Sequence, residues 1–267
     1  MTIQVLVTTM MQNDLSIYSK MNIRTDAIIA NQANSENVRL ESFGSHKAKM
    51  VTTNSRGLSK NRNIAIQHSF ESDSIVLFCD DDLVLEDNYE EQILSEFEKH
   101  QYADAIKFNL RDLSLTRKIS MARITKFEKA TRKNMSSSGV CGLAMRRSVI
   151  QKYSLSFDER FGSGSPNYCG EDTIFLQNII NKRIKVYRSP IVVACIDQTN
   201  STWFEGYTEK YFITCGKVFA VCYPHLCKLL AIRSSFKFSK NKKCSLSFSK
   251  ILNSYFHGIK FFRKNKC

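Results

Sequence analysis

Three consecutive aspartates, Asp80, Asp81 and Asp82, follow directly after an apolar run over residues 75–79. Alternate side chains of an extended backbone point to the same side, so Asp80 and Asp82 converge while Asp81 points away. Two converging carboxylates repel each other unless a cation joins them. Mg²⁺ and Mn²⁺ take carboxylate oxygens and commonly also phosphate oxygens. The triplet therefore indicates a divalent-cation site that can also hold a phosphate, and the alternative interpretation is a solvated acidic turn.

A second acidic pair, Glu171 and Asp172, follows a glycine-rich stretch over residues 161–170. Asp172 lies at the start of a predicted helix over 171–181, where a carboxylate can accept the proton of an attacking hydroxyl. The same carboxylate can instead cap its own helix or stabilise the helix dipole, so both roles stay open. Arg62 is suited to a charge-assisted contact with a phosphate, and the alternative is a solvated helix residue.

These residues need a scaffold, and the first 110 residues alternate between short apolar runs and helical patterns. The predicted strands cover residues 3–9, 26–30, 49–53, 75–79 and 104–109, and the predicted helices cover 58–69 and 88–100. Near-continuous apolar runs are typical of strands that are buried on both faces of a parallel sheet. The alternation predicts an α/β protein with an open sheet, whose ligands bind at the carboxyl ends of the strands. A later strand over 184–188 is expected to end before Pro190.

Five segments in this order resemble the family 2 glycosyltransferases with the GT-A fold: RGLSKNRNIAI (56–66), the acidic triplet, SGVCGLAMRRS (138–148), FDERFG (157–162) and GEDTIFL (170–176). The resemblance covers about residues 3–205 and implies a Rossmann-like, open, mostly parallel sheet flanked by helices. It implies a catalytic domain over 1–205, with a nucleotide-sugar half over 1–110 and an acceptor half over 111–205.

The resemblance implies an inverting transfer of a sugar from a nucleotide diphosphate, a UDP-sugar being favoured, to a hydroxyl of a lipid-linked glycan. Such enzymes act in bacterial surface-polysaccharide synthesis. It also implies that Asp172 is the general base, with Glu171 as the second candidate, and that Asp80 and Asp82 hold Mn²⁺ or Mg²⁺. The donor-binding residues that it implies are Thr8, Thr9, Asn31, Gln32, Arg62, Asp80 and Asp81.

Two places depart from the family pattern. Many relatives carry an aspartate that contacts the base where this chain has Asn31 and Gln32, so the identity of the base stays open. Many also carry a histidine near the metal, where Asp197 stands here as a candidate third ligand. Trp203, the only tryptophan, is a candidate wall for an acceptor sugar, and an ordinary buried aromatic is the alternative.

The net charge of +14 is concentrated at the end of the chain. Residues 226–267 carry eleven Lys or Arg and no acidic residue, which leaves 28 basic and 25 acidic groups in the first 225 residues. Residues 206–267 are expected to form a basic, mostly helical extension. Within 247–263, apolar residues recur at helical spacing among basic ones: Phe248, Ile251, Leu252, Tyr255, Phe256, Ile259 and Phe262. This pattern predicts a helix that lies on an anionic membrane, and the alternative is a helix packed on the domain.

Other features narrow the classes of protein. No run of 18 apolar residues predicts a spanning helix, and MTIQVLVTT at residues 1–9 does not resemble a signal peptide. The nine cysteines include no C-x-x-C pair and are expected to be reduced, in the cytoplasm or at the inner face of the cell membrane. The alternatives are an inactive relative that binds nucleotide sugars and a nucleic-acid-binding protein that uses the basic tail. Nucleic acid is not expected, because the basic residues alternate with apolar ones and no recognition motif occurs.

Overall fold

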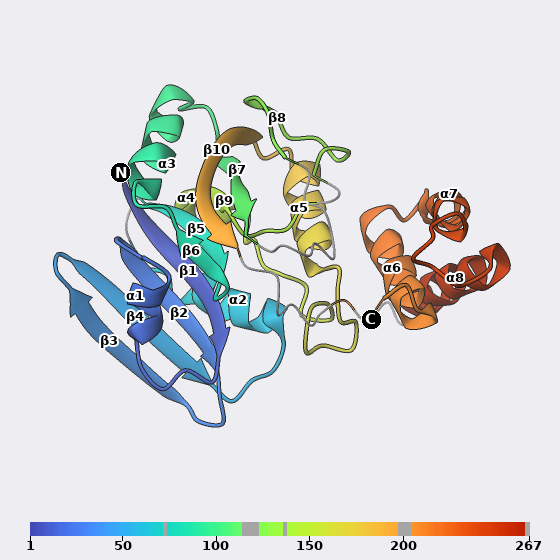
Figure 1. Cartoon of the computed structure of the whole chain (residues 1–267), viewed down its shortest axis with the longest axis horizontal. Coiled ribbons are helices and arrows are strands. Elements are labelled where there is room, and N and C mark those ends of the chain that lie inside the picture. Colours follow the sequence, from blue (N-terminus) through green and yellow to red (C-terminus); the bar gives the residue numbers. More distant parts are fainter. Residues whose placement is uncertain (72–73, 114–122, 136–137, 197–203, 205, 265–267) are drawn as a thin grey trace.

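The computed structural model describes the whole chain except residues 72–73, 114–122, 136–137, 197–203, 205 and 265–267 (Figure 1). Its strands form one ten-stranded sheet in the order β3–β4–β2–β1–β5–β9–β7–β10–β6, with β8 paired to β10. The strands are β1 (Thr2–Met10), β2 (Asp26–Gln32), β3 (Asn37–Phe43), β4 (His46–Thr53), β5 (Ser74–Asp80), β6 (Leu83–Leu85), β7 (Ala105–Asp112), β8 (Glu128–Lys129), β9 (Leu143–Arg146) and β10 (Val186–Ile196).

The run β4–β2–β1–β5 is parallel throughout and contains four of the predicted strands. Its interior residues are buried on both faces, which explains the continuous apolar runs of β1 and β5. Since parallel neighbours end at the same edge of the sheet, β1 and β5 bring Thr8 beside Asp80. The acidic triplet therefore begins at the carboxyl edge of the sheet, as the sequence predicts.

Two layers of helices cover the sheet. The helices α1 (Ser16–Lys20) and α3 (Tyr89–Lys99) contribute to one buried core, against residues such as Val5 and Leu77. The helices α2 (Leu58–Gln67), α4 (Arg147–Lys152) and α5 (Glu171–Asn181) contribute to the other, against Leu6 and Phe78. This arrangement positions the amino ends of α2 and α5 near the carboxyl edge of the parallel strands (Figure 1).

The sheet is mixed where a mostly parallel sheet was expected. Strands β3, β6, β8 and β9 all pair antiparallel with their neighbours. The prediction that a strand ends before Pro190 is wrong, because β10 continues to Ile196. Proline lacks an amide donor and is tolerated at a bulge, and the β7–β10 register shifts between Arg188 and Val192.

The C-terminal extension consists of three helices, α6 (Glu209–Cys222), α7 (Cys227–Ser239) and α8 (Phe248–Lys264), which lie beyond α5 (Figure 1). They share a buried core of their own, which Phe161 and Ile174 join from the preceding domain.

The helix predicted over 247–263 is present as α8. Its apolar side is not free, since Ile251 and Tyr255 are 0% and 1% exposed in the core shared with α6. The packing is mainly against another helix of the extension and not against the catalytic domain. No described helix has the length and apolar character needed to cross a membrane.

Candidate active site

The ends of β1 and β5 form one wall of the site. The hydroxyl of Thr8 donates to Asp80 Oδ1 at 2.7 Å, and the hydroxyl of Thr9 donates to Asp81 Oδ2 at 2.6 Å. Both threonines are buried, at 4% exposure each. Each hydroxyl therefore holds one carboxylate of the triplet in a defined direction. Thr8 and Thr9, which are predicted to bind the donor, thus hydrogen bond to the acidic triplet.

Arg62, on α2, is the central cation of the site and its side chain is 3% exposed. One of its terminal nitrogens lies 3.0 Å from Asp80 Oδ2, and the other lies 2.6 Å from Asp172 Oδ1. The guanidinium also lies over the Phe157 ring, 5.2 Å from its centroid. A planar guanidinium can contact two carboxylates at once, which an ammonium group cannot do with fixed geometry. Arg62 thus brings together the first aspartate of the triplet and the predicted general base.

The Asp172 carboxylate is fixed at its second oxygen as well. Its Oδ2 accepts a hydrogen bond from the Val140 amide at 3.2 Å. A Cβ at position 139 would lie only 3.2 Å from the same oxygen, so glycine at this position lets the Asp172 carboxylate lie close to the backbone. The side chain remains 27% exposed, so it is held on one side and accessible on the other. That geometry is suited to accepting a proton from a bound hydroxyl.

Glu171 lies deeper than Asp172. Its side chain is 12% exposed, its Oε2 is buried without a partner, and its Oε1 lies 3.9 Å from Arg62. Burial, and then the charge of Asp172, raises the pKa of Glu171 to about 7. Glu171 can therefore be protonated near neutral pH, while Asp172 is the carboxylate that faces the open side of the site.

The charges of the triplet differ from one aspartate to the next. Burial alone would raise the pKa of Asp80, but the Arg62 guanidinium and the Thr8 hydroxyl lower it below its usual value. Asp82 is exposed, but partial desolvation by the surrounding chain, and then the Asp80 and Asp81 charges, raise its pKa to about 7. The two anionic neighbours outweigh the Arg62 charge at this position, which makes the Asp82 carboxylate a candidate ligand for a bound cation.

The donor set fits a divalent cation that is shared with a ligand. Asp80 and Asp82 offer the hard oxygen atoms that Mg²⁺ and Mn²⁺ prefer. Among the described residues, no group of three or more His, Cys, Asp or Glu side chains could hold a metal ion. Two carboxylates would therefore leave most of the coordination sphere to water and to phosphate oxygens, which is the usual way Mg²⁺ is bound beside a nucleotide.

Asn31 and Gln32 are buried at 0% and 7% exposure, and both hydrogen bond within the chain. Asn31 joins the Gln12 backbone at 3.0 Å and 2.9 Å, while Gln32 Oε1 accepts from the Gly57 amide at 2.8 Å. They fix the loops that follow β1 and precede α2. Their contact with a nucleotide base stays a prediction. Asp197 and Trp203 lie outside the described residues.

Sequence reasoning missed two polar residues of this region. Asn61 donates from one amide nitrogen to the carbonyls of Thr9 and Ala30, at 3.1 Å and 2.8 Å, and so ties the ends of β1 and β2. Lys107 on β7 is buried, donates to the Cys141 carbonyl, and has its pKa lowered to about 8 by burial. Nothing in the spacing of either residue indicates these contacts, because each partner lies on a different segment.

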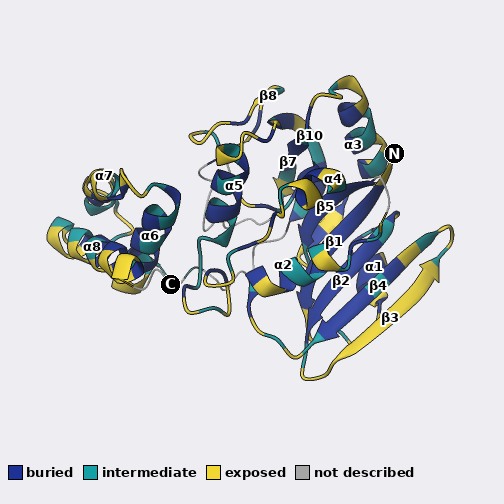
Figure 2. Cartoon of the chain, turned by 180° about the vertical axis from the view of Figure 1, so that it is seen from behind, coloured by how far each residue is buried: buried dark blue, intermediate teal, exposed yellow. Residues whose placement is uncertain are grey.

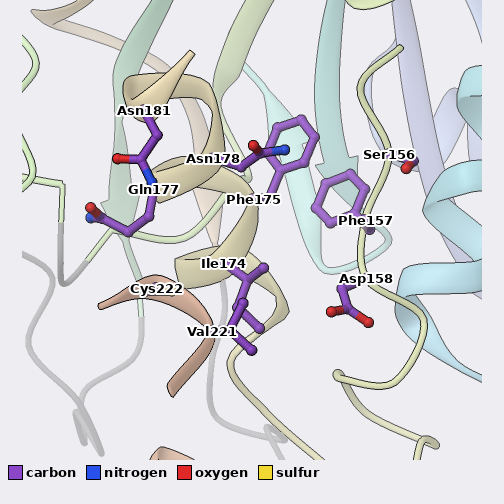
Figure 3. A pocket seen from close by; sticks show the side chains of 10 residues that line it. All are labelled: Ser156, Phe157, Asp158, Ile174, Phe175, Gln177, Asn178, Asn181, Val221 and Cys222. Atoms are coloured by element: carbon purple, nitrogen blue, oxygen red, sulfur yellow. The ribbon is translucent and has the colours of Figure 1, made fainter. Parts of the chain in front are cut away.

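A pocket of about 370 Å³ lies between α5, residues 156–158 and the end of α6, and Asp172 is not among its lining residues (Figure 3). Figure 3 shows the Phe157 and Phe175 rings at its inner wall, where they stack with centroids 4.1 Å apart. Phe157 also contacts Arg62. The pocket is therefore separate from the carboxylate cluster, and Phe157 contacts both.

Comparisons with known proteins identify the family and the fold of the chain. Residues 24–154 match the sequence profile "Glycosyl transferase family 2". No curated protein matches the chain in sequence. Among solved structures, S. aureus TarS 1-349 in complex with UDP-GlcNAc is similar at a TM-score of 0.58 and 14% identity, covering 99% of this chain and 74% of that one. The same fragment in complex with UDP is similar at a TM-score of 0.59 and 13% identity, covering 99% and 92%.

At these identities the structural likeness establishes the fold, and the GT-A prediction is confirmed. The profile match contains the acidic triplet and Arg62, the residues around which the site is built. The chain carries a glycosyl transferase family 2 domain over residues 24–154, and the protein is a glycosyltransferase enzyme.

Proposed function

We propose that the protein is a metal-dependent inverting glycosyltransferase that uses a UDP-sugar donor. The observation that carries the proposal is the double ion pair of Arg62, which joins Asp80 to Asp172 across the site. In the proposed reaction, Asp80 belongs to the donor side and Asp172 to the acceptor side. UDP is favoured because the similar TarS fragment is found in complex with UDP and with UDP-GlcNAc.

In the proposed reaction, an acceptor hydroxyl oxygen attacks the anomeric carbon of the sugar. Asp172 accepts the hydroxyl proton, while the bond from the anomeric carbon to the diphosphate oxygen breaks and its electron pair leaves with the nucleoside diphosphate. Val140 and Arg62 hold the Asp172 carboxylate in place before the acceptor arrives. A preorganised base avoids the cost of orienting it during the reaction.

Asp80 and Asp82 are the residues that we propose to hold Mn²⁺ or Mg²⁺. A bound divalent cation would neutralise the negative charge that develops on the departing diphosphate. Thr8 holds Asp80 in position, and Thr9 turns Asp81 away toward its own hydrogen bond. Arg62 adds a positive charge beside Asp80, which supports binding of an anionic ligand at this edge of the sheet.

The acceptor that we propose is a glycan on a lipid carrier, as in surface-polysaccharide synthesis. Residues 226–267 carry eleven Lys or Arg and no acidic residue, so this end of the chain suits an anionic membrane surface. A protein that acts on lipid-linked glycans from the cytoplasmic side would benefit from such contact. The observation favours this acceptor class and leaves the sugar and the linkage open.

Thermal unfolding with a panel of nucleotide diphosphates and nucleotide sugars, each with and without Mn²⁺, tests the donor and the metal. A ligand at about a hundred times its dissociation constant stabilises the folded state by about 2.7 kcal/mol. We expect UDP and one UDP-sugar to stabilise the protein only with Mn²⁺, and we expect Asp82→Asn to abolish that stabilisation.

Asp87→Asn is the matched control, because Asp87 is a nearby acidic residue whose side chain is 79% exposed and pairs with Arg24. Its stabilisation by UDP and Mn²⁺ should equal that of the unaltered protein. Equal stabilisation of the Asp82→Asn variant would contradict the metal assignment. Binding of a UDP-sugar without any release of UDP over long incubation would favour the inactive relative instead.

A further inference from the structure

Helix α7 carries an apolar face that is largely exposed among the described residues. Leu226, Leu229, Ile232 and Phe236, named here the α7 outer face, are 53%, 63%, 37% and 56% exposed. They are spaced by three, three and four residues, so a helix of 3.6 residues per turn places them on one side. The opposite side of α7, with Ala231 and Ser235, is fully buried. Helix α7 is thus buried on one side and largely exposed on the other.

The position of this face is fixed by the neighbouring helices. The Phe236 ring packs against Phe248 at the start of α8, with centroids 4.5 Å apart. At the other end of α7, Arg263 donates to the Pro224 carbonyl at 2.5 Å and to the Cys227 sulfur at 3.3 Å. The outer face is therefore presented by a rigid three-helix unit.

Basic residues surround the α7 outer face. Lys228, Arg233, Lys237 and Lys240 all belong to α7 or its carboxyl end and are exposed. Residues 210–267 contain no Asp or Glu, so the described part of α7 and α8 has no acidic side chain that could neutralise them. An exposed apolar face with a basic border matches an anionic lipid surface, where the apolar side chains enter the interface and the cations meet headgroups.

We propose that the α7 outer face is a membrane-docking surface for anionic lipids. It replaces the surface that the sequence indicates on 247–263, whose apolar residues are used in packing α8 against α6. A second copy of the chain is a poorer occupant, because it would bring an equally basic border into contact with this one. A nucleic acid would match the charge but would leave Leu229 and Phe236 without apolar partners. The inference rests on exposure and charge in the extension, so it can fail independently of the proposed reaction.

Co-sedimentation of the full-length protein with vesicles tests the proposal. One set of vesicles is phosphatidylcholine alone, and the other contains phosphatidylglycerol in addition. We expect binding to the anionic set and little to the neutral set. The variant Leu229→Ser/Phe236→Ser should lose at least about tenfold in partition coefficient, because two exposed apolar side chains no longer enter the interface. Arg233→Ser/Lys237→Ser should lose roughly tenfold at low salt and much less at high salt.

Val38→Ser/Leu40→Ser is the matched control, because both residues are 58% exposed on β3, away from the extension (Figure 2). This variant should bind like the unaltered protein, within about twofold. All three variants change exposed residues, and unchanged thermal midpoints would verify their folding.

Three results would overturn the proposal. The first is no binding of the unaltered protein to anionic vesicles. The second is equal vesicle binding by the Leu229→Ser/Phe236→Ser variant. The third is self-association of the unaltered protein, seen by light scattering and lost in that variant, because it would make a second copy the occupant. If the unaltered protein does not bind anionic vesicles but binds DNA with a steep dependence on salt, nucleic acid would be the favoured partner.

Discussion

Arg62 compensates the negative charge of the reaction site, and this role sets its expected effect on stability. Four carboxylates of the site, those of Asp80, Asp82, Glu171 and Asp172, lie near one another, and Arg62 has close ion pairs to two of them. Removing one partner of a buried ion pair costs more than the pair contributes, because the remaining charges stay desolvated.

Arg62→Met should therefore destabilise the protein by about 2–3 kcal/mol, since Arg62 is buried but its partners are partly exposed. Arg62→Lys should recover only part of the loss, because an ammonium lacks the planar fork. Urea unfolding near neutral pH measures both. The control is Arg24→Met, whose ion pair with Asp87 is exposed and should contribute less than about 1 kcal/mol. An Arg62→Met variant as stable as the unaltered protein would contradict this account.

Glu171 should make the stability of the protein depend on pH. Its pKa is raised from 4.5 to about 7 in the folded state, so the folded state binds its proton more tightly than the unfolded state does. The protonated Glu171 therefore leaves the folded state at its full stability below about pH 4.5. This contribution to stability is lost as the pH rises through about 7 and Glu171 becomes charged.

Glu171→Gln removes this loss, so the variant should be more stable than the unaltered protein by on the order of 2 kcal/mol at about pH 8. The difference should shrink toward zero at about pH 5. Urea unfolding at both pH values measures it. A variant that is less stable at the higher pH would show that Glu171 is a favourable charge in the folded protein.

At the scale of single elements, two glycines set how closely α6 and α8 approach. A Cβ on Gly216 would overlap the Tyr255 carbonyl, and a Cβ on Gly258 would overlap the Ile213 carbonyl. Both glycines lie within helices, where glycine itself costs about 1 kcal/mol relative to alanine. Their presence is explained by the close contact of the two helix backbones.

Gly216→Ala and Gly258→Ala should each destabilise the protein by about 1–3 kcal/mol, although alanine favours helix formation, because the helices must move apart. Thermal unfolding followed by circular dichroism measures the effect. Lys260→Ala, at an exposed position of α8, is the control and should change stability by less than about 0.5 kcal/mol. Stabilisation by either glycine substitution would show that the helices are not in close contact.

Prediction from the sequence succeeded where burial dictates the residue pattern. The helix predicted over 171–181 matches α5 (Glu171–Asn181), and the buried strands β1 and β5 were found by their apolar runs. Strand β3 was missed because it is exposed along nearly its whole length and is formed by pairing with β4 (Figure 2). The short strand β9 was missed because its place between β5 and β7 depends on partners distant in sequence.

The site was predictable in its residues but not in its connections. Residue type and spacing pointed to the acidic triplet, and the resemblance to family 2 glycosyltransferases pointed to Arg62 and Asp172. Their roles in the reaction stay predictions. That Arg62 joins Asp80 and Asp172 could not be predicted, because the partners lie 18 and 110 residues away. The buried positions of Asn31 and Gln32 depend in the same way on how β2 meets the loops beside it.

At the scale of the whole molecule, Phe161 connects the catalytic domain to the C-terminal helices. Its side chain is fully buried in the core of the extension, and its ring centroid lies 6.2 Å from that of Phe262. Its carbonyl accepts a hydrogen bond from Ser59 on α2 at 2.6 Å. One residue thus links the loop before Asp172, the helix that carries Arg62, and α8.

Phe161→Ala should cost about 3–5 kcal/mol and should loosen the extension first. Limited trypsin digestion measures this, because α7 and α8 contain several Lys and Arg residues, and cleavage there should accelerate more than elsewhere. Phe97→Ala is the control, because Phe97 is fully buried in the core that α1 and α3 form with the sheet. It should accelerate cleavage throughout the chain and not selectively in the extension. Equal digestion patterns for the two variants would contradict the connecting role.

Asp172 is proposed as the general base of the sugar transfer, and the rate at which the protein releases UDP from a UDP-sugar measures this role. Measured with Mn²⁺, the turnover of Asp172→Asn should fall by about 10²–10⁴-fold. Donor affinity, measured separately by calorimetry, should change by less than about threefold, because Asp172 acts on the acceptor side. A variant that releases UDP at the rate of the unaltered protein would contradict the account, as would a loss of donor binding that alone explains the loss of turnover.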